Sequence, residues 1–324
     1  MKLPRRKFLH LAAGAAALPI VSRSARAQTY PARPVHLIVG FAAGGAADVY
    51  TRITSQWLAE RLGQQIVVEN RTGAGSNIAT EAVARASPDG YTLLTCTTAN
   101  AVNASLYEKL DFDFIRDIAP VAELVRSPLV LIVHPSVPTK TVAEFIAYAK
   151  ANPSKLNFAS AGNGTSEHLA GELFKMMAGA DMIHVPFRGG APAMTALLSG
   201  QVQAYFVVAS TSLAGIKAGM RPLAVTTATR WAGLPDVPTL GETLPGYEVS
   251  VWYGVGAPKN TPSGIIEKLN KEINAVLADP KMKAQLSDLG GTPFPGSPGV
   301  FGKFVAAETE RWGKVVRAAN LKAD

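Results

Sequence analysis

Residues 157–172 read NFASAGNGTSEHLAGE. We expect a short strand at 157–161, a tight glycine turn at 162–164 and a helix that begins at Thr165 or Ser166. The helix should present one apolar face, formed by Leu169, Leu173, Met176 and Met177. Because a helix that begins on such a turn leaves backbone N–H groups unpaired beside its positive dipole end, this corner suits an anion such as a carboxylate. The same pattern is also typical of an ordinary capped connection between a strand and a helix.

A second corner of this kind lies near the N-terminus, where residues 35–48 read VHLIVGFAAGGAAD. The pattern predicts a strand at 35–39, a glycine turn, and a helix from about Ala46 whose buried side carries Val49, Ile53, Trp57 and Leu62. It is neither the dinucleotide fingerprint G-x-G-x-x-G nor a phosphate-binding P-loop. Asp48 either caps its own helix or faces the cleft as a hydrogen-bond acceptor. Two such corners could hold the two ends of a diacid.

Strand and helix patterns alternate in two separate units, which predicts an α/β fold with parallel, doubly wound sheets. Predicted strands lie at 35–39, 65–69, 91–97, 120–124, 129–134, 157–161, 182–185, 202–208, 223–227 and 249–255. Predicted helices lie at 78–86, 166–178, 192–198 and 210–218, with others from about 46 and 98. Three C-terminal helices should begin at the pairs Thr261-Pro262, Asp279-Pro280 and Ser297-Pro298.

The C-terminal helices need a sheet to cover, and the first unit is the simplest candidate. We therefore expect the chain to cross between two domains twice, near residues 127 and 250. The predicted domains are 28–126 with 250–324, and 127–249, with a hinged cleft between them.

The N-terminus has the pattern of an export signal. Arg5 and Arg6 precede a modestly apolar run at 11–21, and an A-x-A cleavage site at 25–27 predicts removal after Ala27. The segment resembles a twin-arginine signal, and its apolar run is too short to span a bilayer. We expect the mature chain in the periplasm of a bacterium.

The charge balance gives no support for a nucleic-acid partner, and we expect none. The whole chain carries a formal charge of +8, but six of those positive charges lie in the signal segment, which has no acid, so the rest carries about +2. Cys96 is the single cysteine and is expected to be a small buried residue, so no disulfide forms within the chain. The histidines show no metal-ligand spacing, and we expect no cofactor.

Four motifs carry a resemblance to a known family. They lie at 34–48, 69–75, 161–172 and 184–193 and include both glycine corners. In this order they resemble the Bug family, the periplasmic solute-binding receptors of tripartite tricarboxylate transporters. The resemblance implies a type II periplasmic-binding fold, in which two doubly wound α/β domains joined by two crossing strands close on a small carboxylate.

The resemblance also implies which residues bind the ligand. The first corner supplies Phe41, Ala42, Gly44, Gly45, Ala46 and Asp48, and the second supplies Gly162, Asn163, Gly164, Thr165 and His168. Asn100, Arg188 and Ser210 are added from segments expected at the cleft edge. His168 either donates to the ligand or packs against its loop, and Arg188 either clamps a carboxylate or forms a surface ion pair.

One segment departs from the family pattern. Many members have Asp or Asn followed by a proline-containing loop where this chain has Val-Val-Ala-Ser-Thr at 207–211. We therefore expect a more apolar far wall of the pocket, which disfavours a ligand with a charged amine.

The predicted function is capture of a small carboxylate and its delivery to the membrane permease subunits of a tripartite tricarboxylate transporter, by a monomer without enzymatic activity. A sensor that presents the closed form to a membrane histidine kinase would use the same pocket. A hydrolase is the third alternative, since Thr165 or Ser166 lies near His168, but the G-x-S-x-G elbow is missing.

Overall fold

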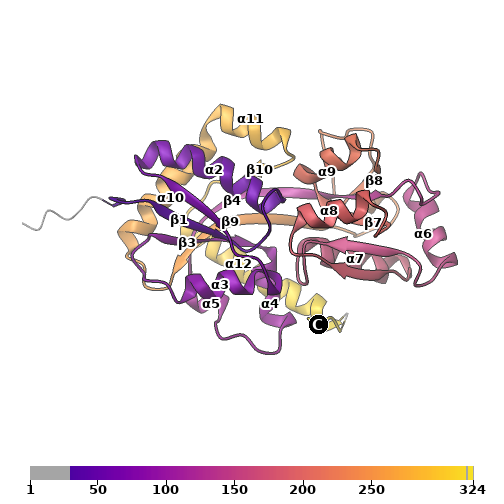
Figure 1. Cartoon of the computed structure of the whole chain (residues 1–324), viewed down its shortest axis with the longest axis horizontal. Helices are drawn as coiled ribbons and strands as arrows, with labels where there is room; N and C mark the ends of the chain where they lie inside the picture. The colour runs from indigo at the N-terminus through magenta and orange to yellow at the C-terminus, as the bar shows by residue number, and fades with distance from the viewer. Residues whose placement is uncertain (1–29, 319, 324) are drawn as a thin grey trace, which may run out of the picture.

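The computed structural model describes residues 30–318 and 320–323, so the predicted signal at 1–27 lies outside the described residues. Two α/β lobes lie side by side and share one long strand, β4 (Ile118–Val133) (Figure 1). The strands follow the order β2-β1-β3-β9-β4-β7-β5-β6, and β8 and β10 also pair with β4.

The first lobe is built on three parallel strands: β1 (Val35–Val39), β2 (Ile66–Asn70) and β3 (Thr92–Thr97). Strand β9 (Ser250–Pro258) continues this sheet, antiparallel to both β3 and β4, and the short β10 (Thr292–Pro293) pairs with β4. The second lobe is built on β5 (Asn157–Ser160), β6 (Ile183–Pro186), β7 (Ala204–Val208) and β8 (Arg221–Val225). There β5 is parallel to β6 and β7, while β4 is antiparallel to β7 and β8.

Strand β4 passes from one sheet to the other without a break. Pro128 pairs with Ser250 of β9, and the next residue, Leu129, pairs with Val208 of β7. The prediction of two strands at 120–124 and 129–134 was wrong, because Pro128 reads as a strand breaker in the sequence. Its missing N–H falls where the strand changes partners, which is a place where proline is tolerated.

The helices cover both faces of the sheets. The first lobe carries α2 (Ala46–Leu62), α3 (Asn77–Ala84), α4 (Thr98–Leu106) and α5 (Phe114–Asp117), with a 3-10 turn η1 (Ala74–Ser76). The second carries α6 (Val142–Ala151), α7 (Ser166–Ala178), α8 (Gly190–Leu198) and α9 (Ala209–Lys217), with a 3-10 turn η2 (Leu240–Glu242). Within the described ranges, none of these elements or the C-terminal helices combines the length and apolarity that a bilayer crossing requires.

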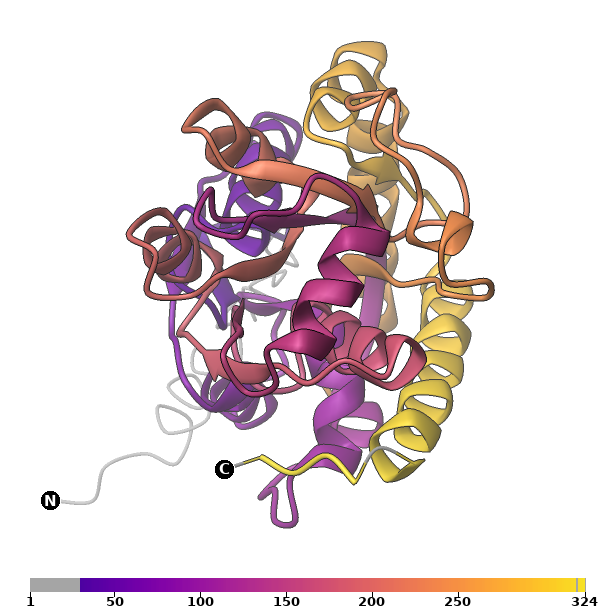
Figure 2. The same ribbon diagram turned by 90° about the vertical axis from the view of Figure 1, so that its right-hand side faces the viewer.

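The C-terminal helices return to the first lobe, as predicted. They are α10 (Ser263–Ala278), α11 (Pro280–Asp288) and α12 (Pro298–Ala318). Helix α10 contacts α2 and β4, and α12 contacts α4 and β4. Figure 2, in which the second lobe faces the viewer, shows the C-terminal helices in yellow along one side of the molecule.

Two of the three predicted helix starts have the predicted geometry. Asp279 accepts a hydrogen bond from Lys281 N at 2.8 Å, and Ser297 Oγ accepts one from Val300 N at 3.3 Å. The third differs, because α10 begins at Ser263 and the Thr261 hydroxyl donates backwards to Pro258 O at 2.7 Å. Thr261 therefore holds the end of β9 and does not cap the helix.

Two predicted helix faces were partly wrong. In α7, Leu169 is buried, but Met176 and Met177 are 51 % and 37 % exposed. The buried positions of α7 also include Gly171, Phe174 and Ala178, and the helix contacts β5 and β7. Two of these three buried residues are small, which the apolar pattern of the sequence does not mark. In α2 the predicted Val49, Ile53, Trp57 and Leu62 are only half-buried, because the side against the sheet carries Ala47, Tyr50, Thr54 and Leu58. A wide apolar stripe in the sequence does not say which of its edges meets the sheet.

Cys96 lies in the core of the first lobe, where burial raises the pKa of its thiol above the usual range. The prediction of a small buried residue is confirmed.

Gly171 lets α7 lie directly on β5, and this contact can be tested. A Cβ atom at Gly171 would lie 2.1 Å from Cε2 of the buried Phe158 ring. We expect Gly171→Ala to lower the free energy of unfolding by about 1–3 kcal/mol, because the ring must move in a filled core.

The matched control is Gly264→Ala in α10, where an added Cβ meets open space. There the exchange should be neutral or stabilise by up to about 1 kcal/mol, since alanine favours a helix over glycine. Urea unfolding of both variants measures the difference, and equal effects would show that α7 does not need this close approach.

Candidate functional site

A pocket lies between the two lobes. Three strand-to-helix corners surround it, and each contributes residues at a helix start. These are Phe41, Gly45, Ala46 and Ala47 after β1, Thr97, Thr98 and Ala99 after β3, and Ala161, Thr165, Ser166 and Glu167 after β5. Gly190, Thr211, Val251 and Tyr253 complete the lining. Both glycine corners expected from the sequence thus face one pocket.

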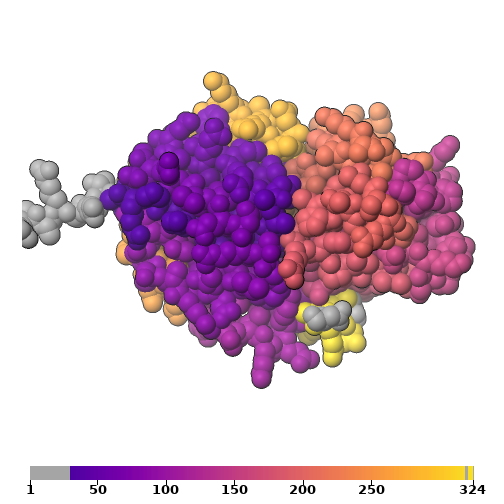
Figure 3. Space-filling view, in the orientation of Figure 1, coloured from indigo at the N-terminus to yellow at the C-terminus, as the bar shows by residue number. Residues whose placement is uncertain are grey.

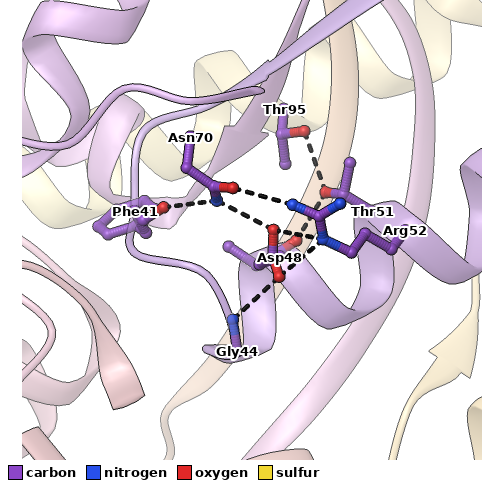
Figure 4. A network of polar contacts seen from close by, with 8 residues as sticks. Phe41, Gly44, Asp48, Thr51, Arg52, Asn70 and Thr95 are labelled. Carbon is purple, nitrogen blue, oxygen red and sulfur yellow. Dashed lines mark hydrogen bonds and ion pairs between the residues drawn. The ribbon is translucent and has the colours of Figure 1, made fainter. Parts of the chain in front are cut away.

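The corner between β1 and α2 is fixed by a carboxylate inside the first lobe (Figure 4). Asp48 is 3 % exposed and accepts a hydrogen bond from Gly44 N at 2.9 Å. Arg52 Nε and Asn70 Nδ2 donate to the same carboxylate at 2.9 Å, and Asn70 also donates to Phe41 O at 2.9 Å. Asp48 therefore holds the turn of its own corner and does not line the pocket.

The ionisation of Asp48 agrees with this role. Burial alone raises the pKa of Asp48, but the hydrogen bonds from Arg52, Gly44 and Asn70 outweigh burial and hold the pKa below its usual value. The carboxylate is thus charged at neutral pH and orients the Gly44 amide, which belongs to a residue with a φ of +79°.

The corner between β5 and α7 is closed by Thr165, the N-cap of the helix. Its Oγ1 accepts from His168 N at 3.4 Å and donates to Gly162 O at 2.7 Å. Gly162 and Gly164 have φ angles of +138° and +77°, so both positions favour glycine. A Cβ at Gly164 would also lie 2.5 Å from Asn103 Oδ1 of the first lobe, so this glycine serves the contact between the lobes.

His168 lies behind the second corner and packs there. Its Nδ1 accepts from Gly164 N at 3.2 Å, and its ring stacks on His184 with centroids 4.0 Å apart. Burial lowers the pKa of His168 to about 4 and that of His184 to about 2, so both rings are neutral at pH 7. His184 Nε2 in turn contacts Ser160 Oγ at 2.6 Å. Of the two roles considered for His168, the described contacts are those of packing.

The third corner, between β3 and α4, contributed only Asn100 to the predicted ligand-binding residues. Asn100 Oδ1 accepts from Thr97 N at 2.7 Å, and its Nδ2 donates to Thr80 Oγ1 at 2.7 Å. Asn100 is buried and forms a capping box with Thr97, so it builds the corner. Thr97, Thr98 and Ala99, which precede it, line the pocket.

The lobes touch directly at the rim of the pocket. Ala42 N donates to Arg188 O at 3.1 Å, and a Cβ at Gly189 would lie 2.7 Å from Ala42 N. A Cβ at Gly45 would lie 3.2 Å from Gly190 N. Figure 3 shows the indigo surface of the first lobe meeting the red surface of the second along a continuous seam. The pocket is therefore covered by backbone on this side.

Four of the predicted ligand-binding residues line the pocket: Phe41, Gly45, Ala46 and Thr165. The others lie around it, namely Ala42, Gly44, Asp48, Asn100, Gly162, Asn163, Gly164, His168, Arg188 and Ser210. Ala42 and Arg188 meet through their backbones, the Arg188 side chain is exposed, and Ser210 precedes the lining residue Thr211. Whether any of them touches a ligand stays a prediction.

The sequence reasoning missed Glu167 and Tyr253. Glu167 is the one charged residue in the predicted turn and helix start at 162–167, and this charge is the feature of the sequence that could have identified it. It is 5 % exposed, and Tyr205 Oη lies 3.5 Å from its Oε1. Burial raises the pKa of Glu167 to about 7, against smaller opposing effects of its own amide, Thr165 and Tyr205. Tyr253 lies on β9, one of the two strands that join the lobes.

Within residues 30–318 and 320–323, no group of three or more His, Cys, Asp and Glu side chains could hold a metal ion. The residues that line the pocket offer hydrogen bonds from helix starts and hydroxyl groups around one buried carboxyl.

Comparisons with known proteins agree with this arrangement. The family described as "Tripartite tricarboxylate transporter family receptor" matches residues 50–321. A Pseudomonas protein, "UPF0065 protein in tcbD-tcbE intergenic region", is 39 % identical over 95 % of this chain and 94 % of its own length. Protein BugT of Bordetella pertussis is 37 % identical over 91 % of this chain and 92 % of its own.

Solved structures are similar over nearly the whole chain. An R. palustris protein determined with adipate has a TM-score of 0.89 and 37 % identity, over 91 % of this chain and 100 % of its own. MatC from Rhodopseudomonas palustris, with bound malate, has a TM-score of 0.85 and 33 % identity, over 89 % of this chain and 100 % of its own. The periplasmic binding protein BugD has a TM-score of 0.87 and 33 % identity, over 91 % of this chain and 100 % of its own.

The Asp48 network generates a stability prediction. Asp48→Ala leaves the Gly44 amide, Arg52 and Asn70 without their shared acceptor. We expect the free energy of unfolding to fall by about 1–3 kcal/mol, because three donors lose the buried carboxylate that they share.

Glu310→Ala is the control, since Glu310 pairs only with Lys314 in α12 and both side chains are about 70 % exposed. An exposed pair of this kind contributes little, so the change should stay within about 0.5 kcal/mol. Thermal and urea unfolding compare the two variants. A loss of unfolding free energy no larger than in the control would show that Asp48 does not stabilise this corner.

Proposed function

Because the chain belongs to the tripartite tricarboxylate transporter receptor family, we propose that the pocket between its lobes captures a small carboxylate. The family and the fold predicted from the four motifs are confirmed: two doubly wound α/β lobes are joined by β4 and β9. The chain is a solute-binding protein of this family, and the chemistry of its pocket supports the carboxylate class.

One observation carries the proposal. Two helices from different lobes begin at the same pocket, α2 after Gly45 and α7 after Thr165. Each start presents backbone N–H groups and the positive end of a helix dipole. An anionic group between them gains hydrogen bonds from both lobes, without an Arg or Lys side chain among the residues that line the pocket.

The solved relatives support the same ligand class. The R. palustris protein was determined with adipate and MatC with malate, both of them dicarboxylates. In this chain the starts of α2 and α7 face the pocket, where a carboxylate of such an acid finds backbone N–H donors.

Closure of the lobes couples ligand binding to a change in conformation. We assign 28–126 with 250–324 to one domain and 127–249 to the other, with the hinge in β4 and β9 where the chain changes sheets. A ligand held by both corners stabilises the closed form, because its contacts to both lobes exist only there. The backbone hydrogen bond from Ala42 to Arg188 supports this assignment.

The cellular setting is part of the proposal. Export directed by residues 1–27, with cleavage after Ala27, places the mature chain in the periplasm as a monomer. There it delivers its ligand to the permease subunits of a tripartite tricarboxylate transporter. Of the alternatives, a sensor would use the same closed form and is separated from a transporter by uptake in a deletion strain.

A hydrolase is disfavoured by the contacts at the second corner. Thr165 Oγ1 contacts Gly162 O and His168 N, while His168 Nδ1 contacts Gly164 N. A nucleophile and its base need a direct hydrogen bond, and this pair lacks one. Recovery of a bound acid unchanged after incubation supports a receptor, and its turnover would support an enzyme.

Gly45→Val tests where the ligand binds. The φ of −78° at Gly45 suits valine, but the added side chain projects toward Gly190 of the other lobe and into the pocket. We expect carboxylate affinity to fall at least about 100-fold, because the corners can no longer approach each other.

The binding assay is calorimetric titration with a panel of mono-, di- and tricarboxylates, after removal of any co-purified ligand. Gly264→Val makes the same substitution in open space and should bind like the wild type. Unchanged affinity in a folded Gly45→Val protein would place the ligand elsewhere. A wild-type protein that binds no member of the panel would contradict the proposed ligand class.

A further inference from the structure

Glu167 is the one charged side chain that lines the described part of the pocket. It belongs to the first turn of α7 and is 5 % exposed, so its carboxyl group lies within the wall. Its hydrogen bond from Tyr205 is long, at 3.5 Å. Thr165 and its own backbone N–H are the other described groups close enough to stabilise its charge.

No Arg or Lys side chain is among the described residues that line the pocket with Glu167. Tyr205 on β7 and Tyr253 on β9 face it, and burial together with the Glu167 charge raises the pKa of both phenols above the usual range. His168, the next residue of α7, is neutral and turned toward Gly164 and His184. A buried carboxylate without a cationic partner is costly, so a ligand that supplies a proton or a positive charge relieves that cost.

This geometry bears on which carboxylates fit. The α2 and α7 starts favour one anionic group, while Glu167 repels a second. A fully ionised dicarboxylate would bring a second negative charge into the pocket that Glu167 lines, and no cationic side chain is among the described lining residues. A hydrogen-bond donor on the ligand would instead complete the hydrogen bonding of Glu167.

We propose that Glu167 selects carboxylates that also carry a hydrogen-bond donor, such as an ammonium, amide or hydroxyl group, over fully ionised dicarboxylates. This inference rests on the proposed function. It differs from the expectation of an apolar far wall, which was drawn from residues 207–211. Only Thr211 of that segment lines the pocket, and the expectation did not include Glu167.

The test uses six-carbon probes that differ only at one end: adipate, the monoamide of adipic acid, and 6-aminohexanoate. Their affinities are measured by calorimetry at pH 8 for the wild type and Glu167→Gln. We expect the wild type to bind the amide or the amine at least about tenfold tighter than adipate. In Glu167→Gln, the affinity for adipate relative to that for 6-aminohexanoate should rise at least about tenfold, because the repelling charge is gone and the side chain keeps its shape.

Glu172→Gln is the matched control in the same helix. Glu172 pairs with Lys175 at 2.9 Å and does not line the pocket. It should keep the wild-type ranking of the three probes, which separates a pocket effect from a general change in the charge of α7.

A pH series gives an independent readout. The pKa of Glu167 is raised to about 7, so its carboxyl gains a proton between pH 8 and pH 6.5. The tyrosines that face it stay neutral over this range. Adipate affinity should therefore rise severalfold in the wild type as the pH falls and stay nearly constant in Glu167→Gln, relative to each protein's value at pH 8.

The outcomes separate the two proposals. If carboxylates bind but adipate is preferred at pH 8 and Glu167→Gln leaves the ranking unchanged, the role of Glu167 is overturned and the receptor function stands. If no carboxylate binds the wild type, the proposed function fails and this inference fails with it. A reversed ranking in Glu167→Gln alone, together with the pH dependence, supports it.

Discussion

The structure depends on how closely two backbones approach each other at the rim of the pocket. Ala42 and Arg188 share a backbone hydrogen bond, and Gly45 and Gly189 close to them leave no side chain in the way. Because backbone meets backbone there, the starts of α2 and α7 reach the same small space from opposite lobes. Side chains at these positions would hold the lobes apart and leave each helix start facing solvent alone. The pocket is thus a consequence of contact between lobes, and neither lobe contains it by itself.

Much of the fold could be predicted because local patterns and tertiary structure agree. The strands at 35–39 and 157–160 and the helix at 166–178 have the expected positions, since glycine turns and caps mark their ends clearly. Strand β4 could not be predicted as one element, because Pro128 ends a strand in most contexts. The orientation of α7 was also out of reach, since Met176 and Met177 fit the apolar pattern and yet face solvent.

The site was predictable in its backbone and not in its side chains. Glycine turns before helices identify where N–H groups are free, so both corners could be found. Asp48, Asn100 and His168 are polar residues in those corners, and the sequence cannot tell a side chain that builds a corner from one that meets a ligand. In the structure all three make hydrogen bonds within their own corners, to Gly44, Thr97 and Gly164. Glu167 reaches the pocket because of the position it takes in the first turn of α7, and tertiary structure decides that.

The position of β9 has a consequence for how the protein is made. In the first lobe, β9 lies between β3 and β4. It is synthesised some 120 residues after the end of β4, so it leaves the ribosome much later. Until that strand is synthesised, the nascent chain holds two open sheet edges, on β3 and β4, that can pair wrongly with other chains. The second lobe has all its strands earlier and can fold first. Synthesis of β9 and of the chain after it therefore decides when the newly made protein stops being at risk of aggregation.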